Sequence, residues 1–168
     1  MMLLPWQQPR IIEHSQRLIH SYEYWTGTQL LPALAKAALA RQLFESPFIV
    51  LSHGLEVDPI LNYGNQSALD LWQIEWEQLI QMPSRLTAEP TERNARAQLL
   101  AEAATAGLIQ NYCGIRVTRT GRRFLIENAT IWDVLDEGGL CCGQAATFTH
   151  WQWLDSNLGQ EPDVGICV

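Results

Sequence analysis

The chain has 168 residues, 47% hydrophobic and 17% charged, which is enough for one folded domain with an extension and is not typical of a disordered protein. Its net charge of −7 and pI near 5.0 argue against direct binding to nucleic acid or an anionic membrane, which requires a positive field. Apolar runs are too short to span a membrane, no signal peptide is recognisable, and the cysteine spacing matches neither a zinc site nor a disulfide scaffold. We therefore expect a soluble cytoplasmic protein without a metal site.

The N-terminal part is predicted to be helical. Over residues 9–26, apolar residues recur at alternating spacings of four and three, which indicates an amphipathic helix that Gly27 ends. A second, alanine-rich helix is expected over residues 31–45, with Pro32 in its first turn. We interpret residues 1–43 as a helical extension of the domain that follows.

The middle of the chain reads as short strands and helices, and the C-terminal part as hairpins. Strands are predicted over 48–53 and 60–63, two short helices over 66–82, a longer helix over 91–106, and three hairpin strands over 109–120, 122–136 and 140–151. Residues 44–154 would then form the core domain, and residues 155–168 a polar, frayed tail.

The strand over residues 122–136 is apolar on both of its alternating faces. One face is predicted to carry Phe124, Ile126, Trp132 and Val134, and the other Leu125, Ala129, Ile131 and Leu135. A strand of this kind is buried on both sides. The short helices can cover one face of the sheet, and the N-terminal helix is the natural cover for the other, in this chain or from a partner.

This order of elements resembles a PAS domain. The segment "DPILNYGNQSALDLW" at residues 58–72 is similar to the PAS segment in which an asparagine at a strand end caps the helix of the cavity wall. Together with "PSRLTAEPTER", "YCGIRVTRTGRRFLIENATIWDVLDEGG" and "GQAATF", it resembles the MEKHLA family over about residues 10–150. That family includes stand-alone bacterial and cyanobacterial proteins, which this chain looks like, and the C-terminal domain of plant class III homeodomain-leucine zipper factors.

The resemblance implies an α+β fold. It would have a PAS-like antiparallel sheet, short helices on one face, and the N-terminal amphipathic helices over the other. It also implies a sensory or regulatory role, without implying a particular ligand or reaction.

The candidate pocket residues are polar or aromatic groups on the elements expected to surround a PAS-type cavity. They are Asn62, Tyr63, Asn65, Trp72, Ser84, Arg85, Arg123, Glu127, Trp132 and Gln144. Gln144, a polar residue among small ones on a central strand, is the most ligand-like of them. Asn65 has an alternative role as a helix N-cap. Arg85 is expected to hold its loop through Glu89, and Arg123 to form an ion pair with Glu127 or Asp133 on the same strand face.

Neither flavin nor haem is supported by the sequence, and the identity of any cofactor stays open. By resemblance, Ser84 occupies the position where flavin-binding photosensory PAS domains have the cysteine that bonds to the flavin. A serine hydroxyl without a base is a poor nucleophile, which disfavours a light-driven adduct. No histidine lies in the middle region where a PAS haem ligand is usually found, and His53 is interpreted as a strand-end residue.

Two functional hypotheses follow. The first is a PAS-like sensory or regulatory domain that binds a small ligand or a partner and has no catalytic activity. The second is a ligand-free interaction module that forms a homodimer through its N-terminal helix or its sheet face. An enzyme is disfavoured, because no nucleophile, base and orienting group converge in the predicted fold.

Overall fold

The computed structural model describes residues 2–89 and 93–154, so the predicted tail at 155–168 lies outside the described residues. The elements in chain order are η1 (Pro5–Gln7), α1 (Pro9–Thr26), α2 (Lys36–Phe44), β1 (Ile49–His53), β2 (Leu61–Gly64), α3 (Gln66–Trp72), α4 (Trp76–Leu79), η2 (Ser84–Thr87), α5 (Arg93–Ala106), β3 (Leu108–Val117), β4 (Arg123–Leu135), β5 (Cys141–Phe148) and β6 (His150–Trp153).

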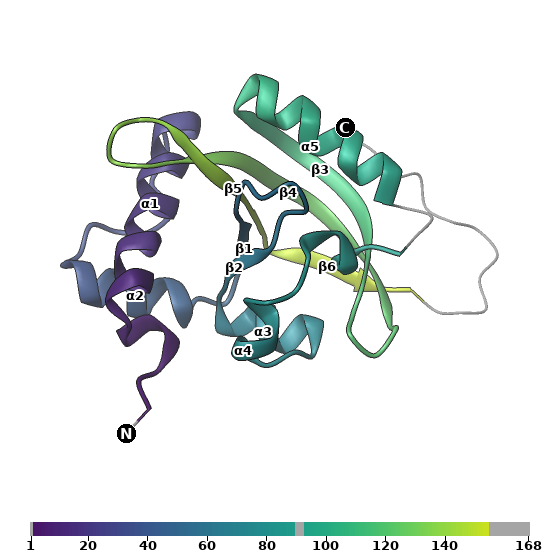
Figure 1. The fold of residues 1–168 in the computed structure, drawn as a ribbon, viewed down its shortest axis with the longest axis horizontal. Helices are drawn as coiled ribbons and strands as arrows, with labels where there is room; N and C mark the ends of the chain where they lie inside the picture. The colour runs from purple at the N-terminus through teal and green to yellow at the C-terminus, as the bar shows by residue number, and fades with distance from the viewer. Residues whose placement is uncertain (1, 90–92, 155–168) are drawn as a thin grey trace.

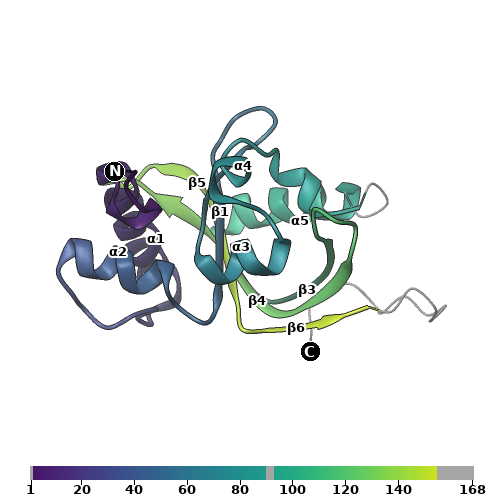
Figure 2. The same ribbon diagram turned by 90° about the horizontal axis from the view of Figure 1, so that it is seen from below.

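The strands form one six-stranded antiparallel sheet in the order β2-β1-β5-β4-β3, and β6 pairs with the first part of β4. The helices α1 and α2 lie on one side of this sheet, and α3, α4 and α5 lie on the other (Figures 1 and 2). The predicted α+β class and the three-strand meander of β3, β4 and β5 are therefore confirmed.

Helix α1 covers one face of the sheet within the same chain. We call this face the outer face, and the face toward α3, α4 and α5 the inner face. Gly27 ends the helix in the left-handed conformation, with φ of 71°. The Tyr22 ring packs edge-on against Trp132, with 5.1 Å between the ring centroids. Trp25 Nε1 donates to the Asp133 carbonyl at 2.9 Å, and the Leu135 amide donates to Ser21 Oγ at 2.7 Å. The predicted role of the N-terminal helix as a sheet cover is thus seen within a single chain.

Two predicted elements differ clearly from the structure. The second helix begins at Lys36 instead of residue 31, because Leu31 is drawn into the hydrophobic core and the residues after it run extended. The last predicted strand is two strands, since β5 pairs with β1 as far as Phe148 whereas β6 pairs only with β4.

The prediction of which β4 side chains share a face of the strand is wrong. The predicted burial of the strand on both faces is confirmed. Asn128 has φ of 52° and Asn111 on β3 has φ of 58°, and the pairing of the two strands shifts register around Tyr112. Each asparagine adds a residue to its strand, which reverses the alternation of side chains beyond it. Ile126 therefore shares the inner face of the sheet with Ala129, while Trp132 points toward α1.

Candidate functional site

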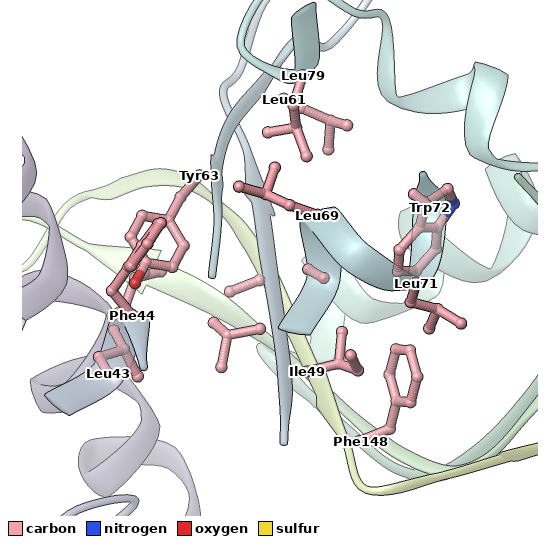
Figure 3. Packing of buried hydrophobic residues seen from close by; sticks show 14 of the residues in the cluster. Leu43, Phe44, Ile49, Leu61, Tyr63, Leu69, Leu71, Trp72, Leu79 and Phe148 are labelled. Carbon is pink, nitrogen blue, oxygen red and sulfur yellow. The ribbon is translucent and has the colours of Figure 1, made fainter. Parts of the chain in front are cut away.

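A cavity of about 70 Å³ lies between the inner face of the sheet and the helices α3 and α5. Strands β1 to β5 all contribute to its wall. Its lining residues are Leu51, Ser52, His53, Leu61, Trp72, Thr87, Arg96, Leu100, Tyr112, Arg116, Ile126, Ala129, Ile131, Gln144, Ala145, Ala146 and Phe148. Two residues of the apolar wall, Trp72 and Phe148, lie on the same side of β1 in Figure 3.

Strand β3 places a buried cation in this wall. Tyr112, Gly114 and Arg116 occupy alternate positions and share one face of the strand. Arg116 is only 8% exposed, and its Nη2 donates to the Tyr112 hydroxyl at 2.9 Å while Nη1 donates to the Ile115 carbonyl at 2.8 Å. A Cβ at Gly114 would collide with the Tyr112 hydroxyl, so the glycine leaves the space that this contact needs.

Helix α5 places a second cation in the same cavity. Arg96 lines it from the helical side, and burial together with the neighbouring Arg116 lowers the pKa of Arg96 to about 10. The group therefore remains protonated at neutral pH.

Gln144 lies where the cavity meets a second hollow. Its Nε2 donates to the Leu100 carbonyl on α5 at 3.1 Å and to Asp133 Oδ1 at 3.2 Å. Burial raises the pKa of the Asp133 carboxyl. The second hollow, of about 250 Å³, shares His53, Leu100 and Gln144 with the cavity. The contact between Gln144 and Leu100 thus separates the cavity from the outer hollow.

Two buried polar atoms of lining residues have no hydrogen-bond partner among the described residues. They are His53 Nε2 and Trp72 Nε1. The other ring nitrogen of His53, Nδ1, lies 2.8 Å from the Gly54 carbonyl, and burial lowers the pKa of this histidine. Because a carbonyl only accepts, Nδ1 carries the proton and Nε2 of the neutral ring is an unused acceptor.

Of the residues predicted to form the pocket, Trp72 and Gln144 line the cavity. Asn62 and Tyr63 lie away from it. Asn62 Oδ1 accepts a hydrogen bond from Ser52 Oγ at 2.5 Å, and the Ser52 oxygen contacts His14 Nε2 of α1 at 2.9 Å. Tyr63 points toward Phe44 and away from Trp72 in Figure 3. Burial raises the pKa of Tyr63.

Asn65, Ser84 and Trp132 also lie outside the cavity lining. The Asn65 carbonyl oxygen accepts from the amides of Ala68 and Val50, and its nitrogen donates to the carbonyls of Leu43 and Phe48. The predicted N-cap role is confirmed, because one of these bonds caps α3. Ser84 is buried in η2, and Trp132 is buried against α1.

The charged candidates have partners at the surface of the core. Arg85 pairs with Asp58 at 3.2 Å, not with Glu89 as predicted. Glu89 instead pairs with Arg123 at 2.9 Å, so the predicted pairing of Arg123 within β4 is corrected. The bulge at Asn128 explains this for Asp133, because it moves Asp133 to the other face of the strand from Arg123. Glu127 accepts a hydrogen bond from Gln152 at 2.9 Å.

Three cavity-lining residues were not predicted from the sequence: Arg96, Tyr112 and Arg116. Arg116 carried a readable signal, because it is the one charged residue in the otherwise mostly apolar run "YCGIRV" at residues 112–117 and shares a strand face with Gly114. Arg96 carried none, since several polar residues surround it on α5 and the sequence does not show which helix face meets the sheet.

Other features of the described residues give no competing site. They contain no cluster of three or more His, Cys, Asp or Glu side chains that could hold a metal ion. No helix among them is both long enough and apolar enough to cross a membrane. Larger hollows of about 390 and 460 Å³ occur at the surface beside the N-terminal segment and α2, away from the sheet interior.

Curated proteins similar to this chain include plant proteins named homeobox-leucine zipper proteins. Homeobox-leucine zipper protein ATHB-9 of Arabidopsis thaliana is 25% identical over 143 residues, which cover 82% of this chain and 17% of that protein. Homeobox-leucine zipper protein HOX29 of Oryza sativa subsp. indica is 22% identical over 142 residues, covering 82% and 16%. The chain thus spans a small fraction of the length of these relatives.

Solved structures similar to this one are PAS and light-oxygen-voltage domains. The PAS domain of a protein from Colwellia psychrerythraea has a TM-score of 0.56 and 14% identity, covering 68% of this chain and 92% of that one. An RNA-binding light-oxygen-voltage receptor has a TM-score of 0.56 and 18% identity, covering 76% and 35%. A light-oxygen-voltage domain studied with a flavin analogue has a TM-score of 0.55 and 12% identity, covering 71% and 87%. These likenesses establish a PAS-like fold. The model of the MEKHLA domain matches residues 12–153, and the chain therefore belongs to the MEKHLA domain family.

Proposed function

We propose that this chain is a PAS-like sensory and regulatory domain that binds a small ligand in the cavity beneath α5 and has no catalytic activity of its own. The observation that carries the proposal is the cavity itself, which lies in the interior of a PAS-like fold and is lined by cations and by polar atoms without a partner among residues 2–89 and 93–154. Such groups beside apolar walls are typical of ligand sites.

A flavin does not suit this cavity, although one similar structure is a light-oxygen-voltage domain studied with a flavin analogue. The cavity of about 70 Å³ is well below the roughly 300 Å³ at which pockets for larger organic ligands begin. Ser84 has no thiol and lies outside the lining. We therefore propose a ligand smaller than a flavin.

We propose that a ligand enters the cavity where Gln144 contacts Leu100. This contact separates the cavity from the outer hollow and consists of a single hydrogen bond of 3.1 Å between β5 and α5. Displacement of α5 by a ligand would be a change that a partner protein could read.

The test is a native mass spectrum of the protein purified from its own host, together with the cavity-filling variant Ala146→Leu. We expect a reproducible non-covalent adduct on the wild-type chain and its loss from Ala146→Leu, because Ala146 lines the cavity. Exposed Ala38 on α2 provides the matched control, Ala38→Leu, which should keep the adduct. A bare wild-type chain combined with a more stable Ala146→Leu variant would contradict the proposal.

A ligand-free module that forms homodimers is the second candidate. The small volume of the cavity favours it, as do the exposed apolar side chains of Met2, Leu3, Leu4 and Tyr24 near the N-terminal helices. Since α1 covers the sheet, we propose that dimer contacts would use the outward face of that helix. A species of twice the chain mass without an adduct would favour this candidate over the first.

A cytoplasmic location and the lack of direct nucleic-acid binding stay predictions. One similar structure is an RNA-binding receptor, but the net charge of −7 argues against direct RNA binding by this chain.

A further inference from the structure

Two arginine side chains line the same small cavity from different walls. Arg116 belongs to β3, and Arg96 belongs to α5, which packs over β3 and β4. Among the described residues, neither guanidinium has a carboxylate within ion-pair distance; the arginine ion pairs that are present involve Arg17, Arg41, Arg85 and Arg123. Among the described residues, the hydrogen-bond acceptors of Arg116 are neutral oxygens, the Tyr112 hydroxyl and the Ile115 carbonyl.

Within the part of the chain that the structure describes, no negative charge offsets these two cations. A buried cation without a counter-charge is unfavourable, and a second cation beside it adds repulsion. The lowered pKa of Arg96 reflects both effects, and the group nevertheless stays charged at neutral pH. An anion between the two guanidinium groups would remove the repulsion and pair both charges.

The unpartnered polar atoms are an independent indication of a ligand. Trp72 is 3% exposed and His53 is 9% exposed, and both line the cavity. Trp72 Nε1 and His53 Nε2 have no hydrogen-bond partner among the described residues. Buried polar atoms are nearly always paired, so an acceptor such as a ligand oxygen is expected near the Trp72 N–H, whereas the His53 acceptor needs a donor such as water.

From these observations we infer that the cavity binds a short monocarboxylate, with its carboxylate between Arg96 and Arg116. The inference rests on the proposed ligand-binding function and specifies its chemistry. A volume of about 70 Å³ corresponds to a molecule of roughly four to seven non-hydrogen atoms, at about 10 to 15 Å³ for each water-sized probe. The remaining wall includes Leu61, Ile126, Ile131 and Phe148, which suits a short apolar tail behind the charged group.

The test is isothermal titration calorimetry of the full chain with three probes at constant ionic strength. Propionate is the expected ligand, propionamide is its neutral analogue of the same shape, and inorganic phosphate is an anion without an apolar part. We expect propionate to bind, propionamide to bind at least about tenfold more weakly because it lacks the charge, and phosphate to bind more weakly than propionate.

Variants assign the binding to the two arginines. Arg96→Gln and Arg116→Gln should each weaken propionate binding about tenfold or more, whereas exposed Arg119→Gln, on the neighbouring β3–β4 turn, should leave it unchanged. Arg116→Lys keeps the charge and should retain part of the affinity. If Arg116→Gln does not fold, as judged by circular dichroism, Arg96→Gln and Arg116→Lys still decide the question.

The outcomes separate this inference from the proposed function. Equal affinity for propionate and propionamide, or unchanged propionate affinity in Arg96→Gln, overturns the inference. Tighter binding of phosphate overturns the carboxylate class. A neutral compound found on the native protein overturns the inference but leaves the ligand-binding domain intact. The absence of both an adduct and propionate binding overturns both.

Discussion

At the scale of single residues, His14 links α1 to the sheet. Its Nε2 lies 2.9 Å from Ser52 Oγ, and the Ser52 hydroxyl donates to Asn62 Oδ1 at 2.5 Å. Because the hydroxyl has one proton and donates it to Asn62, the Ser52 oxygen must accept from His14. The neutral His14 ring therefore carries its proton on Nε2. Burial, assisted by Arg17, lowers the pKa of His14 from 6.5 to about 4. Protonation of this ring is therefore unfavourable in the folded protein.

The lowered pKa predicts a loss of stability in mild acid. The unfolded chain binds a proton at this ring below pH 6.5, whereas the folded chain does so only below about pH 4. The free energy of unfolding should thus fall by roughly 2 kcal/mol between pH 7.5 and 5 through His14, with a contribution of the same sign from His53. Urea unfolding at both pH values measures this change.

The variant His14→Gln should show a smaller difference between the two pH values, because glutamine does not titrate. His20 lies exposed on the same helix, and His20→Gln is the matched control that should keep the wild-type difference. Identical pH dependence in the wild type and His14→Gln would show that His14 is not the source.

At the scale of elements, the paired bulges of β3 and β4 determine which side chains face the cavity. Asn128 is exposed and has φ of 52°, a left-handed conformation that β-branched residues adopt only with strain. We predict that Asn128→Val lowers the free energy of unfolding by about 1 to 3 kcal/mol, whereas Asn128→Gly leaves it nearly unchanged or raises it.

Chemical denaturation measures both variants. Thr130→Val, two residues further along the same strand, controls for the general effect of valine, since Thr130 is not among the residues with positive φ. If Asn128→Val were as stable as Thr130→Val, the left-handed conformation would not be required there.

The same bulges mark the limit of what the sequence could predict. Helix and strand periodicity located α1, most of the strands and the antiparallel meander of β3 to β5, because these follow from local patterns of burial and turn residues. An asparagine in a left-handed conformation looks like any other asparagine in a strand, so the reversed faces of β4 could not be read. Gln144 was found because a polar residue among small ones is visible locally. Arg96 was not found, because its place in the cavity depends on which face of α5 packs against the sheet.

At the scale of the whole molecule, Asp133 joins three parts of the structure. Its amide donates to the Gly107 carbonyl at the end of α5, and its carbonyl accepts from Trp25 of α1, both at 2.9 Å. Its carboxylate accepts from Gln144 at the cavity. This residue therefore connects α1, the end of α5 and the proposed entrance at Gln144.

We predict that Trp25→Phe, which keeps an aromatic ring but removes the N–H donor, loosens α1 and lowers the free energy of unfolding by about 1 kcal/mol or more. Amide hydrogen exchange should accelerate in α1. Trp6→Phe is the control, since the contact of Trp6 with Arg41 involves only the ring face and should largely survive. Unchanged exchange in α1 for Trp25→Phe would contradict the link.

The position of α1 also has a consequence for synthesis and folding of the chain. The bond from Trp25 to Asp133 spans 108 residues, and the pair of Arg17 with Glu137 spans 120. The helix is thus synthesised well before the strand that buries its apolar face. Because closing so long a loop is entropically costly, docking of α1 belongs to the late steps of folding. Until β4 is in place, the nascent protein exposes an amphipathic helix to its surroundings.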